Sequence, residues 1–236
     1  RNLSYIMVLF SISALLFACS KDEEEPRVIE RSTVTDIHGK VYKTVKIGDQ
    51  WWMAENLQTR TFRNGDPLNL ILGDAPNELW ATEDTSACTY ALDSTKGFLY
   101  NYDAVMDPRG IAPEGWRIPT DEDWKKLEAY IGMSESEVSK TAWRGTTEGE
   151  LLASKNSLGW GQGSLFGKDE YGFNGQPGGV RIHDGRSNLT GEVALWWTST
   201  PKDSLVWYRY MDSHETRVFR HYTYPTYGMS IRCIKE

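Results

Sequence analysis

Three cysteines, Cys19, Cys88 and Cys233, are the residues of this chain best suited to covalent chemistry. A thiol can carry a lipid, pair in a disulfide, ligate a metal or act as a nucleophile, and its surroundings decide among these roles. Cys19 ends an apolar run, whereas the other two lie far apart in polar and strand-like surroundings. We therefore expect Cys19 to differ in role from the other two.

The apolar run before Cys19 extends from Ile6 to Ala18. Its length is typical of the core of an export signal and is too short for a mature membrane-spanning helix. The tetrapeptide at residues 16–19 resembles the lipobox of bacterial lipoproteins, in which small residues admit the signal peptidase. We interpret residues 1–18 as a lipoprotein signal peptide and Cys19 as an acylated residue that carries fatty acids such as palmitate. An ordinary signal peptide with an incidental cysteine is the alternative.

Residues 19–32 begin with the charged stretch 20–26, which contains no apolar side chain to bury. Such a stretch stays solvated, so we interpret it as an acidic tether. It is similar to the acidic export tags of surface lipoproteins in some Gram-negative bacteria. We expect a protein held in the outer membrane by the lipid on Cys19 and facing the cell exterior. A plain spacer on a periplasm-facing protein is the alternative.

The composition of the chain fits one exported domain, residues 33–236, of about 200 residues. The 26 Lys and Arg against 33 Asp and Glu, without a basic block, argue against a nucleic-acid partner. Ten Trp, twelve Tyr and 21 Gly suit short strands, turns and aromatic clusters.

Cys88 and Cys233 are the two thiols left once Cys19 carries a lipid. Because an exported protein meets an oxidising compartment, we predict a disulfide between them. It would close a loop of about 145 residues and contribute on the order of 4–5 kcal/mol. Two separately buried free thiols are the alternative.

Short strands are predicted at both ends of the domain. Near the start, residues 33–57 combine apolar residues at strand spacing with glycine turns. Near the end, residues 194–199, 205–211, 217–222 and 229–234 predict a set of antiparallel strands. Residues 63–97 show little periodicity and are interpreted as a long ordered loop carrying Trp80 and Cys88.

The clearest helix signal follows Thr120, which can cap the first turn. Three carboxylates at residues 121–123 lie at the positive end of the helix dipole, which explains them without catalysis. Gly132 ends the helix, and residues 134–137 and 150–153 predict two further short helical segments. The apolar face of the first helix is formed by Trp124, Leu127 and Ile131.

Six motifs in a fixed order resemble the Fibrobacter succinogenes major paralogous domain, a family of exported bacterial domains. The resemblance covers residues 33 to 236, and its members often follow lipoprotein signals. Some members carry a cysteine where this chain has Ala112, so its cysteine pairing can differ from theirs. The motifs are VTDIHGKVY at 34–42, IGDQWWMAENL at 47–57, GFLYNY at 97–102, APEGWRIPTDEDW at 112–124, WWTST at 196–200 and GMSIRC at 228–233.

The resemblance implies an α+β, C-type-lectin-like fold, in which two helices flank small antiparallel sheets and a long Gly-rich loop region projects to one side. It implies no reaction, since members are usually regarded as surface binding or adhesion modules. We expect a non-catalytic module with a glycan or protein ligand. A structural component of a surface appendage or complex is the alternative.

An enzymatic alternative comes from residues 117–124, which also resemble the Arg-x-Pro-Thr-x-x-x-Trp element of formylglycine-generating enzymes. Those enzymes share the lectin-like fold but use two nearby cysteines late in the chain, whereas here only Cys233 is late. Ser199, Asp212 and His214 can be drawn as a hydrolase triad, yet Ser199 lacks a nucleophile elbow. We do not expect an enzyme.

Metal and cofactor sites are not indicated by the sequence. The four histidines, His38, His183, His214 and His221, show no spacing that builds a zinc site. No cofactor is expected, and a calcium ion held by loop oxygens is the alternative.

The stretch between Gly145 and Gly191 contains twelve of the 21 glycines and shows neither helical nor strand period. Its aromatic faces and directional polar groups suit sugars and peptides, so it and the strand at 217–222 are the predicted binding face. The alternative is that its aromatics fill a core of their own. The candidate residues are Trp160, Tyr171, Phe173, Arg181, His183, Asp184, Arg186, Asn188, Arg217 and Tyr222.

The tryptophans of the motifs are assigned instead to the core, because they lie on regular elements that need burial. On this basis Trp160→Ala or Arg181→Ala is expected to weaken binding without loss of stability. The core set comprises Trp51, Trp52, Trp116, Trp124, Trp196 and Trp197.

We predict that Cys19→Ala yields unlipidated protein in the soluble fraction or an uncleaved precursor, because the variant lacks the acyl acceptor. Fractionation with metabolic fatty-acid labelling measures this outcome. A variant of mature size that stays with membranes as the parent does would refute lipidation at Cys19.

Overall fold

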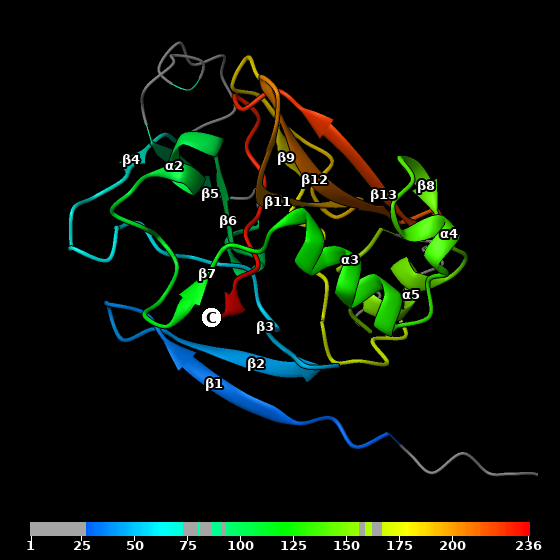
Figure 1. Ribbon diagram of the computed structural model, residues 1–236. Coiled ribbons are helices and arrows are strands. Elements are labelled where there is room, and N and C mark those ends of the chain that lie inside the picture. The colour runs from blue at the N-terminus through cyan, green and yellow to red at the C-terminus, as the bar shows by residue number, and fades with distance from the viewer. Residues whose placement is uncertain (1–26, 73–79, 81–85, 91–92, 156–158, 162–166) are drawn as a thin grey trace, which may run out of the picture.

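A computed structural model of the protein describes residues 27–72, 80, 86–90, 93–155, 159–161 and 167–236. The predicted signal peptide, the lipidation site Cys19 and most of the acidic tether lie outside these residues. The described chain forms four sheets and several short helices, an α+β architecture (Figure 1).

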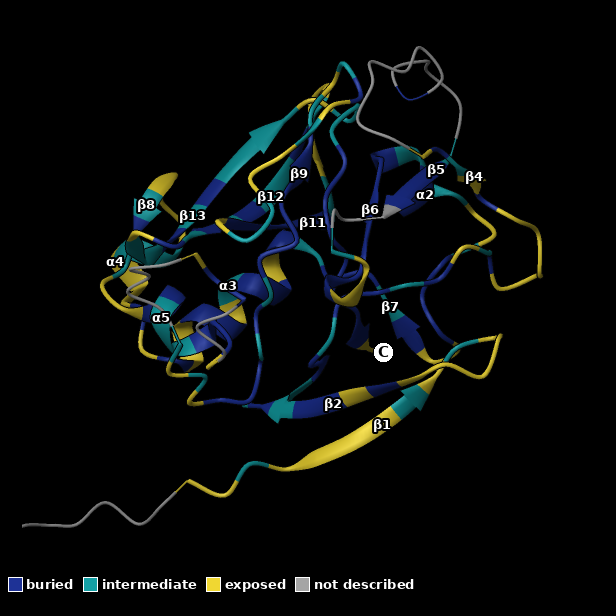
Figure 2. Ribbon diagram, turned by 180° about the vertical axis from the view of Figure 1, so that it is seen from behind, coloured by how far each residue is buried: buried dark blue, intermediate teal, exposed yellow. Residues whose placement is uncertain are grey.

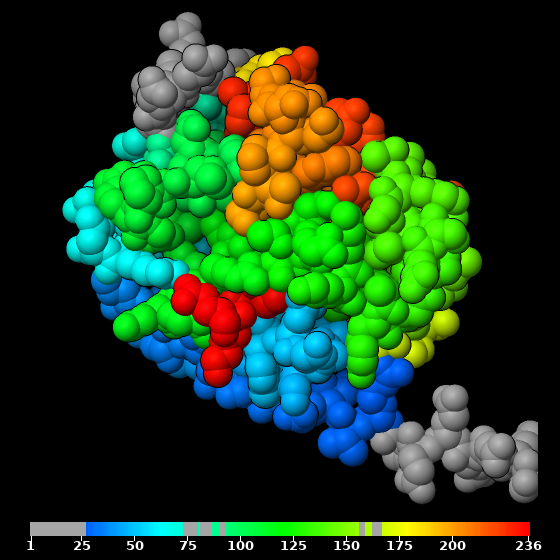
Figure 3. Space-filling view, in the orientation of Figure 1, coloured from blue at the N-terminus to red at the C-terminus, as the bar shows by residue number. Residues whose placement is uncertain are grey.

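A five-stranded sheet, in the order β1-β2-β3-β14-β7, forms the base of the domain in Figure 1. Its neighbouring strands pair antiparallel. Figure 3 shows the red C-terminal residues lying between the blue N-terminal segment and the green middle of the chain. The last strand therefore closes the domain by joining its first and middle segments. The strands are β1 (Arg31–Thr35), β2 (Val41–Ile47), β3 (Gln50–Met53), β7 (Trp116–Arg117) and β14 (Ile234–Lys235).

A four-stranded antiparallel sheet, in the order β11-β12-β13-β8, contains three of the predicted C-terminal strands. The fourth prediction, for residues 229–234, was wrong in most of its length. Met229 and Ser230 make only isolated bridges, and Ile234 joins the base sheet. The strands are β8 (Ala142–Arg144), β11 (Val193–Lys202), β12 (Leu205–Asp212) and β13 (Glu215–Thr223).

Two small sheets complete the β structure. The prediction of a loop over residues 63–97 missed the first of them, because strands of two to four residues are too short to show periodicity. The first sheet contains β4 (Asn69–Leu70), β5 (Ala87–Tyr90) and β6 (Phe98–Tyr100), and a 3-10 turn, η1 (Ser94–Lys96), precedes β6. The second sheet is the hairpin of β9 (Val180–Arg181) and β10 (Ser187–Asn188).

The predicted helix after Thr120 is confirmed as α3 (Asp121–Tyr130), with Thr120 and Asp123 forming a capping box. The two short helical predictions are confirmed as α4 (Glu135–Val138) and α5 (Glu148–Leu152), although the Ser134 side chain makes no capping hydrogen bond. One further helix, α2 (Tyr102–Met106), was not predicted. None of the helices in the described part of the chain is long and apolar enough to cross a membrane.

Tryptophan rings connect the two larger sheets through α3. The ring centroid of Trp124 on α3 lies 5.1 Å from that of Trp52 on β3 and 5.8 Å from that of Trp196 on β11. All three are buried, as are Trp116 and Trp197, which confirms their assignment to the core. Trp51 is half-buried.

A buried arginine, Arg232, joins three of the sequence motifs. Its Nη2 donates to Asn56 Oδ1 over 2.7 Å, and Trp196 Nε1 donates to the same oxygen over 2.9 Å. Burial lowers the pKa of Arg232 to about 9. Gly97 lies against this group with a φ of 99°, and a Cβ there would come within 2.5 Å of the Cβ of Asn56. These motif residues are therefore explained by packing and hydrogen bonding in the core.

Five buried charged side chains attach α3 to the four-stranded sheet. Arg209 Nε lies 2.6 Å from Glu128 Oε1, and Arg209 Nη1 lies 2.8 Å from Asp121 Oδ1. Arg144 pairs with Glu128 and Arg220 with Asp121, each at 2.7 Å. Burial opposes ionisation of Asp121, yet its two arginine partners hold its pKa below the usual range. We call these five residues the buried charge network.

The predicted Cys88–Cys233 disulfide is not formed, since both cysteines are free and buried. Cys88 pairs with Tyr100 in the three-stranded sheet, whereas the carbonyl of Cys233 accepts a hydrogen bond from Met53 of the base sheet. The two thiols are thus fixed by different sheets and fill the same apolar core as separate small side chains. The alternative of two buried free thiols is the one the structure shows.

We predict that Glu128→Gln lowers the free energy of unfolding by about 3–5 kcal/mol, because it leaves two buried arginines without their shared counter-charge. Chemical denaturation followed by tryptophan fluorescence measures the change. Glu122→Gln, on the exposed side of the same helix, is the matched control and should cost under about 0.5 kcal/mol. Equal stability of the two variants would contradict this role of the network.

Candidate ligand-binding face

The face of the four-stranded sheet that is turned away from α3 carries a group of aromatic rings, beside the buried residues Leu195 and Trp197 of β11. Because side chains alternate along a strand, the neighbours of Arg209 and Arg220 point away from α3. Figure 2 shows that β13 is mainly of intermediate exposure. Rings from three strands gather there, and all are half-buried. We call this set the aromatic face: Trp143, Tyr208, Tyr210, Phe219 and His221.

The rings of the aromatic face support one another. Phe219 lies at the centre, with its centroid 5.0 Å from Trp143, 5.7 Å from Tyr210 and 6.3 Å from Tyr208. His221 stacks on Phe219 with centroids 5.7 Å apart. Each such ring contact contributes about 0.5–1.5 kcal/mol of stability in addition to that from buried area. The rings are therefore held in place without a ligand.

Hydrogen-bonding and charged groups border these rings. Arg217 precedes Phe219 by two residues and so lies on the same face, where its Nε donates to Glu215 Oε1 over 2.9 Å. Hydrogen bonds from Arg217 lower the pKa of Glu215. Burial raises the pKa of Tyr208 to about 12, so its hydroxyl stays protonated at neutral pH and can donate. The face thus combines apolar rings with fixed polar groups.

The β9–β10 hairpin contains five of the predicted binding residues, of which Arg181 is buried. Asp184 and Arg186 bind each other across the turn, with Arg186 Nε donating to Asp184 Oδ2 over 2.8 Å. These hydrogen bonds lower the pKa of Asp184. His183 and Asn188 are exposed, and the His183 ring lies 6.0 Å from Tyr227. Tyr227 packs on the same core cluster as Tyr208 and Tyr210, so the hairpin lies beside the aromatic face.

Four predicted binding residues are buried, so their assignment to an exposed face was wrong. Trp160 is 1% exposed, and its Nε1 donates to Ser154 Oγ over 3.2 Å. Phe173 packs against the tryptophan rings of the core, and Tyr171 is 7% exposed. Arg181 is fully buried and lies over the Trp80 ring. The Gly-rich segment follows the core closely, so its large side chains turn inward.

Tyr222 lies on the opposite face of β13 from Phe219. Its ring meets Trp207 edge-on at 5.1 Å, and the guanidinium of Arg220 lies 3.7 Å from the Trp207 ring centre. Of the predicted candidates on β13, Arg217 therefore lies on the aromatic face, and Tyr222 contacts that face through His221, with ring centroids 4.5 Å apart. None of the five rings was named as a candidate, although Phe219 and His221 lie on the strand at 217–222 that was predicted to belong to the binding face, and alternate aromatic residues at 208 and 210 are visible in the sequence.

The residues of the enzymatic alternatives have structural roles. Arg117 Nη1 pairs with Asp123 over 2.6 Å at the start of α3, which explains the Arg-x-Pro-Thr element. Ser199 donates to the carbonyl of Ile118, whereas Asp212 lies opposite Val193, six residues before Ser199 on β11. Six strand residues span roughly 20 Å, so these residues do not form a triad.

The described residues contain no group of three or more His, Cys, Asp or Glu side chains that could hold a metal ion. The four histidines lie on different segments: His38 in the β1–β2 turn, His183 in the β9–β10 turn, His214 between β12 and β13, and His221 on β13.

Comparison with known proteins gives one match. The family model of the Fibrobacter succinogenes major domain matches residues 45–235, which confirms the resemblance found in the motifs. No curated protein and no solved structure matches the chain significantly.

We predict that Trp160→Ala lowers the free energy of unfolding by about 3–5 kcal/mol, as Trp124→Ala should, because both leave a large cavity. Thermal and chemical denaturation measure the loss. His183→Ala, an exposed residue of the same Gly-rich stretch, is the control and should leave stability unchanged. A stable Trp160→Ala protein would restore the original expectation of an exposed binding side chain.

Proposed function

We propose that this chain, which belongs to the Fibrobacter succinogenes major domain family, is a non-catalytic binding module whose aromatic face holds a glycan. The observation that carries the proposal is the group of five contacting, half-buried rings on one face of the four-stranded sheet. A contiguous group of apolar rings that stays partly exposed and has polar groups around it is a mark of an interaction site.

A glycan suits this face better than a protein partner. The flat C–H faces of sugar rings pack on aromatic rings, and sugar hydroxyls need directional donors and acceptors beside them. Tyr208 and Tyr210 supply hydroxyls, and the Arg217–Glu215 pair supplies charged groups at the border. The mixture of rings and ionised groups therefore favours a sugar chain.

The position of the aromatic face supports a surface role. Trp124 of α3 lies between Trp52 of the base sheet and Trp196 of the four-stranded sheet, so α3 separates the two sheets. In Figure 1 the strands β12 and β13, which carry most of the aromatic face, lie in the upper part of the domain, whereas the chain enters through β1 at the base. A lipid on Cys19, at the end of the tether before β1, would leave this face pointing away from the outer membrane. We propose this orientation toward the cell exterior.

The C-type-lectin-like assignment of the fold is part of the same proposal. Small antiparallel sheets, the helices α2 and α3, and the irregular stretch between α5 and β11 support it. These features follow the order that the family resemblance implies.

The cysteines support a non-catalytic role over a relationship to formylglycine-generating enzymes. Burial raises the pKa of Cys88 and of Cys233 to about 12. The thiolate is the reactive form of cysteine, so neither side chain is activated at neutral pH. Their surroundings are those of structural thiols in an apolar core.

We predict that Trp143→Ala weakens glycan binding about tenfold, because losing one stacked ring costs about 1.4 kcal/mol. A glycan array on the purified protein identifies the ligand, and calorimetry measures the change. Tyr224→Ala removes an exposed ring outside the aromatic face and is the matched control. Full affinity in Trp143→Ala, or no glycan on the array, would favour the structural-component alternative.

A further inference from the structure

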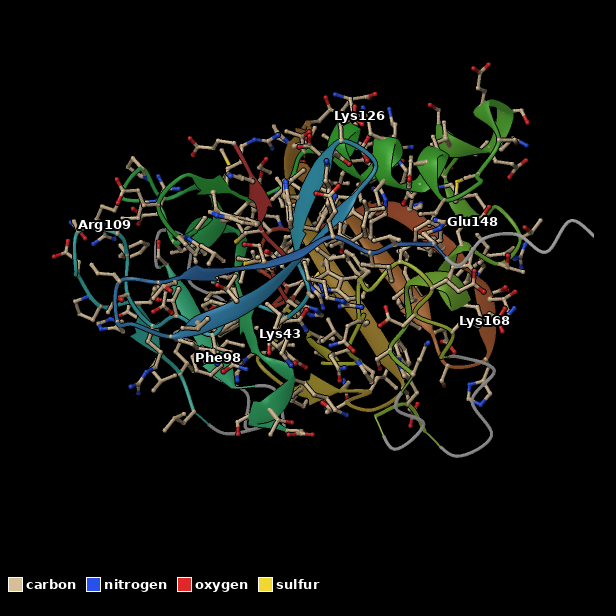
Figure 4. The ribbon with its side chains drawn as sticks, turned by 90° about the horizontal axis from the view of Figure 1, so that it is seen from below. Lys43, Phe98, Arg109, Lys126, Glu148 and Lys168 are labelled. Carbon is tan, nitrogen blue, oxygen red and sulfur yellow. The ribbon has the colours of Figure 1, made fainter. Side chains whose placement is uncertain are left out.

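The first strand of the domain, β1, has one edge that no strand of the described chain covers. On its other edge it pairs with β2 along its whole length, from Arg31 opposite Val45 to Thr35 opposite Val41. The base sheet begins at β1, so its strand order places no neighbour beyond it. Figure 4, seen from below, shows β1 and β2 as two blue strands running across the base in front of the rest of the chain. The N–H and C=O groups on the free edge of β1 are therefore open to another strand.

This edge lacks most of the features that normally protect an edge strand. Proline, lysine, a bulge or a covering helix usually prevents such a strand from pairing with a second chain. The sequence of β1, RSTVT, contains no proline and no lysine, and its pairing with β2 runs without a register shift. Three of its residues, Thr33, Val34 and Thr35, are β-branched and favour a strand. Figure 2 shows β1 as mainly exposed, so the strand is both formed and accessible.

The residues of β1 suit a second copy of the same strand in antiparallel orientation. All residues of the strand pair only if the two copies are centred on Thr33, which then lies opposite the Thr33 of the second copy. Arg31 lies opposite Thr35, so the two arginines stay about 14 Å apart along the strands. Opposed threonines are a favourable cross-strand pair, whereas a parallel arrangement in register would place Arg31 opposite Arg31. The strand is therefore self-complementary in the antiparallel orientation.

Exposed apolar side chains flank β1 on both sides. Val28, before the strand, is 89% exposed, and Ile37, after it, is 52% exposed. In the arrangement centred on Thr33, the end of β1 that follows Val28 meets the end that leads to Ile37 in the second copy, and the two-fold symmetry repeats this contact. Burial of these side chains would add to the backbone hydrogen bonds. We infer that two copies of this chain pair through β1 in antiparallel orientation, which joins their base sheets into one continuous sheet.

Such a dimer is weak in dilute solution and is favoured where copies of the chain are concentrated. One pair of short strands buries less than the roughly 1,200–2,000 Å² of a standard stable interface. Confinement raises the effective concentration of one copy near another, and the predicted lipid on Cys19 would confine the chain to a membrane. The aromatic face belongs to the four-stranded sheet, so pairing through the base sheet leaves that face free.

Disulfide trapping in cells that express the full chain tests the pairing. Directly opposed residues of antiparallel strands have Cα atoms about 4.5–5.5 Å apart, within the reach of a disulfide. Under mild oxidation Thr33→Cys should therefore give a covalent dimer. The matched control is Ser32→Cys, also exposed, whose two copies would lie about 7–8 Å apart and should be trapped about tenfold less. The parent gives the background from the native cysteines. No dimer above that background, or trapping of Ser32→Cys equal to that of Thr33→Cys, would overturn the inference.

Charge exchange at the same position separates pairing from folding. Thr33→Lys and Thr33→Glu each place like charges directly opposite each other in the dimer, so each variant alone should lose self-association. The two variants expressed together should pair with each other, because opposite charges then meet. Co-isolation of two differently tagged copies after chemical crosslinking measures the pairing. Both variants should keep a cooperative unfolding transition, since Thr33 is exposed. Self-association of either variant at the level of the parent, or failure of the two to pair, would contradict pairing centred on Thr33.

Discussion

The buried charge network decides how the four-stranded sheet faces the rest of the molecule. Three arginines and two carboxylates lie between α3 and the sheet, and leaving any of them unpaired in the core is costly. Arg209 and Arg220 are directly opposite each other on neighbouring strands and both point inward. Because a strand has a period of two, Tyr208, Tyr210, Phe219 and His221 are forced outward. An internal electrostatic requirement thus produces an external aromatic surface.

The second constraint is the arginine at residue 232, whose neighbours come from motifs far apart in sequence. Asn56 Oδ1 accepts hydrogen bonds from its guanidinium and from Trp196 Nε1, and Arg117 pairs with Asp123 in a further motif. The residues that make the family recognisable are therefore largely those that hold the fold together. This explains why the family resemblance predicts an architecture but names no ligand.

Local patterns were sufficient where a few neighbouring residues determine the structure. The N-cap at Thr120 and the apolar face of α3 lie within twelve residues, and both were predicted correctly. The short strands β4 and β5 were missed because they form through hydrogen bonds to neighbouring strands and show no strand pattern in their own residues. The disulfide was predicted only because an exported protein meets an oxidising compartment. The two cysteines are instead held apart as free thiols, because Cys88 and Cys233 are fixed by different sheets. The rings at Trp160 and Phe173 were expected outside because no local signal distinguishes an inward loop from an outward one.

The inward turn of the loop aromatics changes where ligand contacts can form. The predicted candidates Trp160, Tyr171 and Phe173 pack into the core and are not accessible to a ligand. The exposed candidates of the Gly-rich stretch, such as His183, lie in the β9–β10 hairpin. The aromatic face instead stands on paired strands whose inner side is fixed by ion pairs and whose rings contact one another. Ordering a flexible loop costs binding energy, whereas a rigid sheet has lost that entropy already on folding. The same arginines that stabilise the fold would therefore also raise the affinity of the surface opposite them.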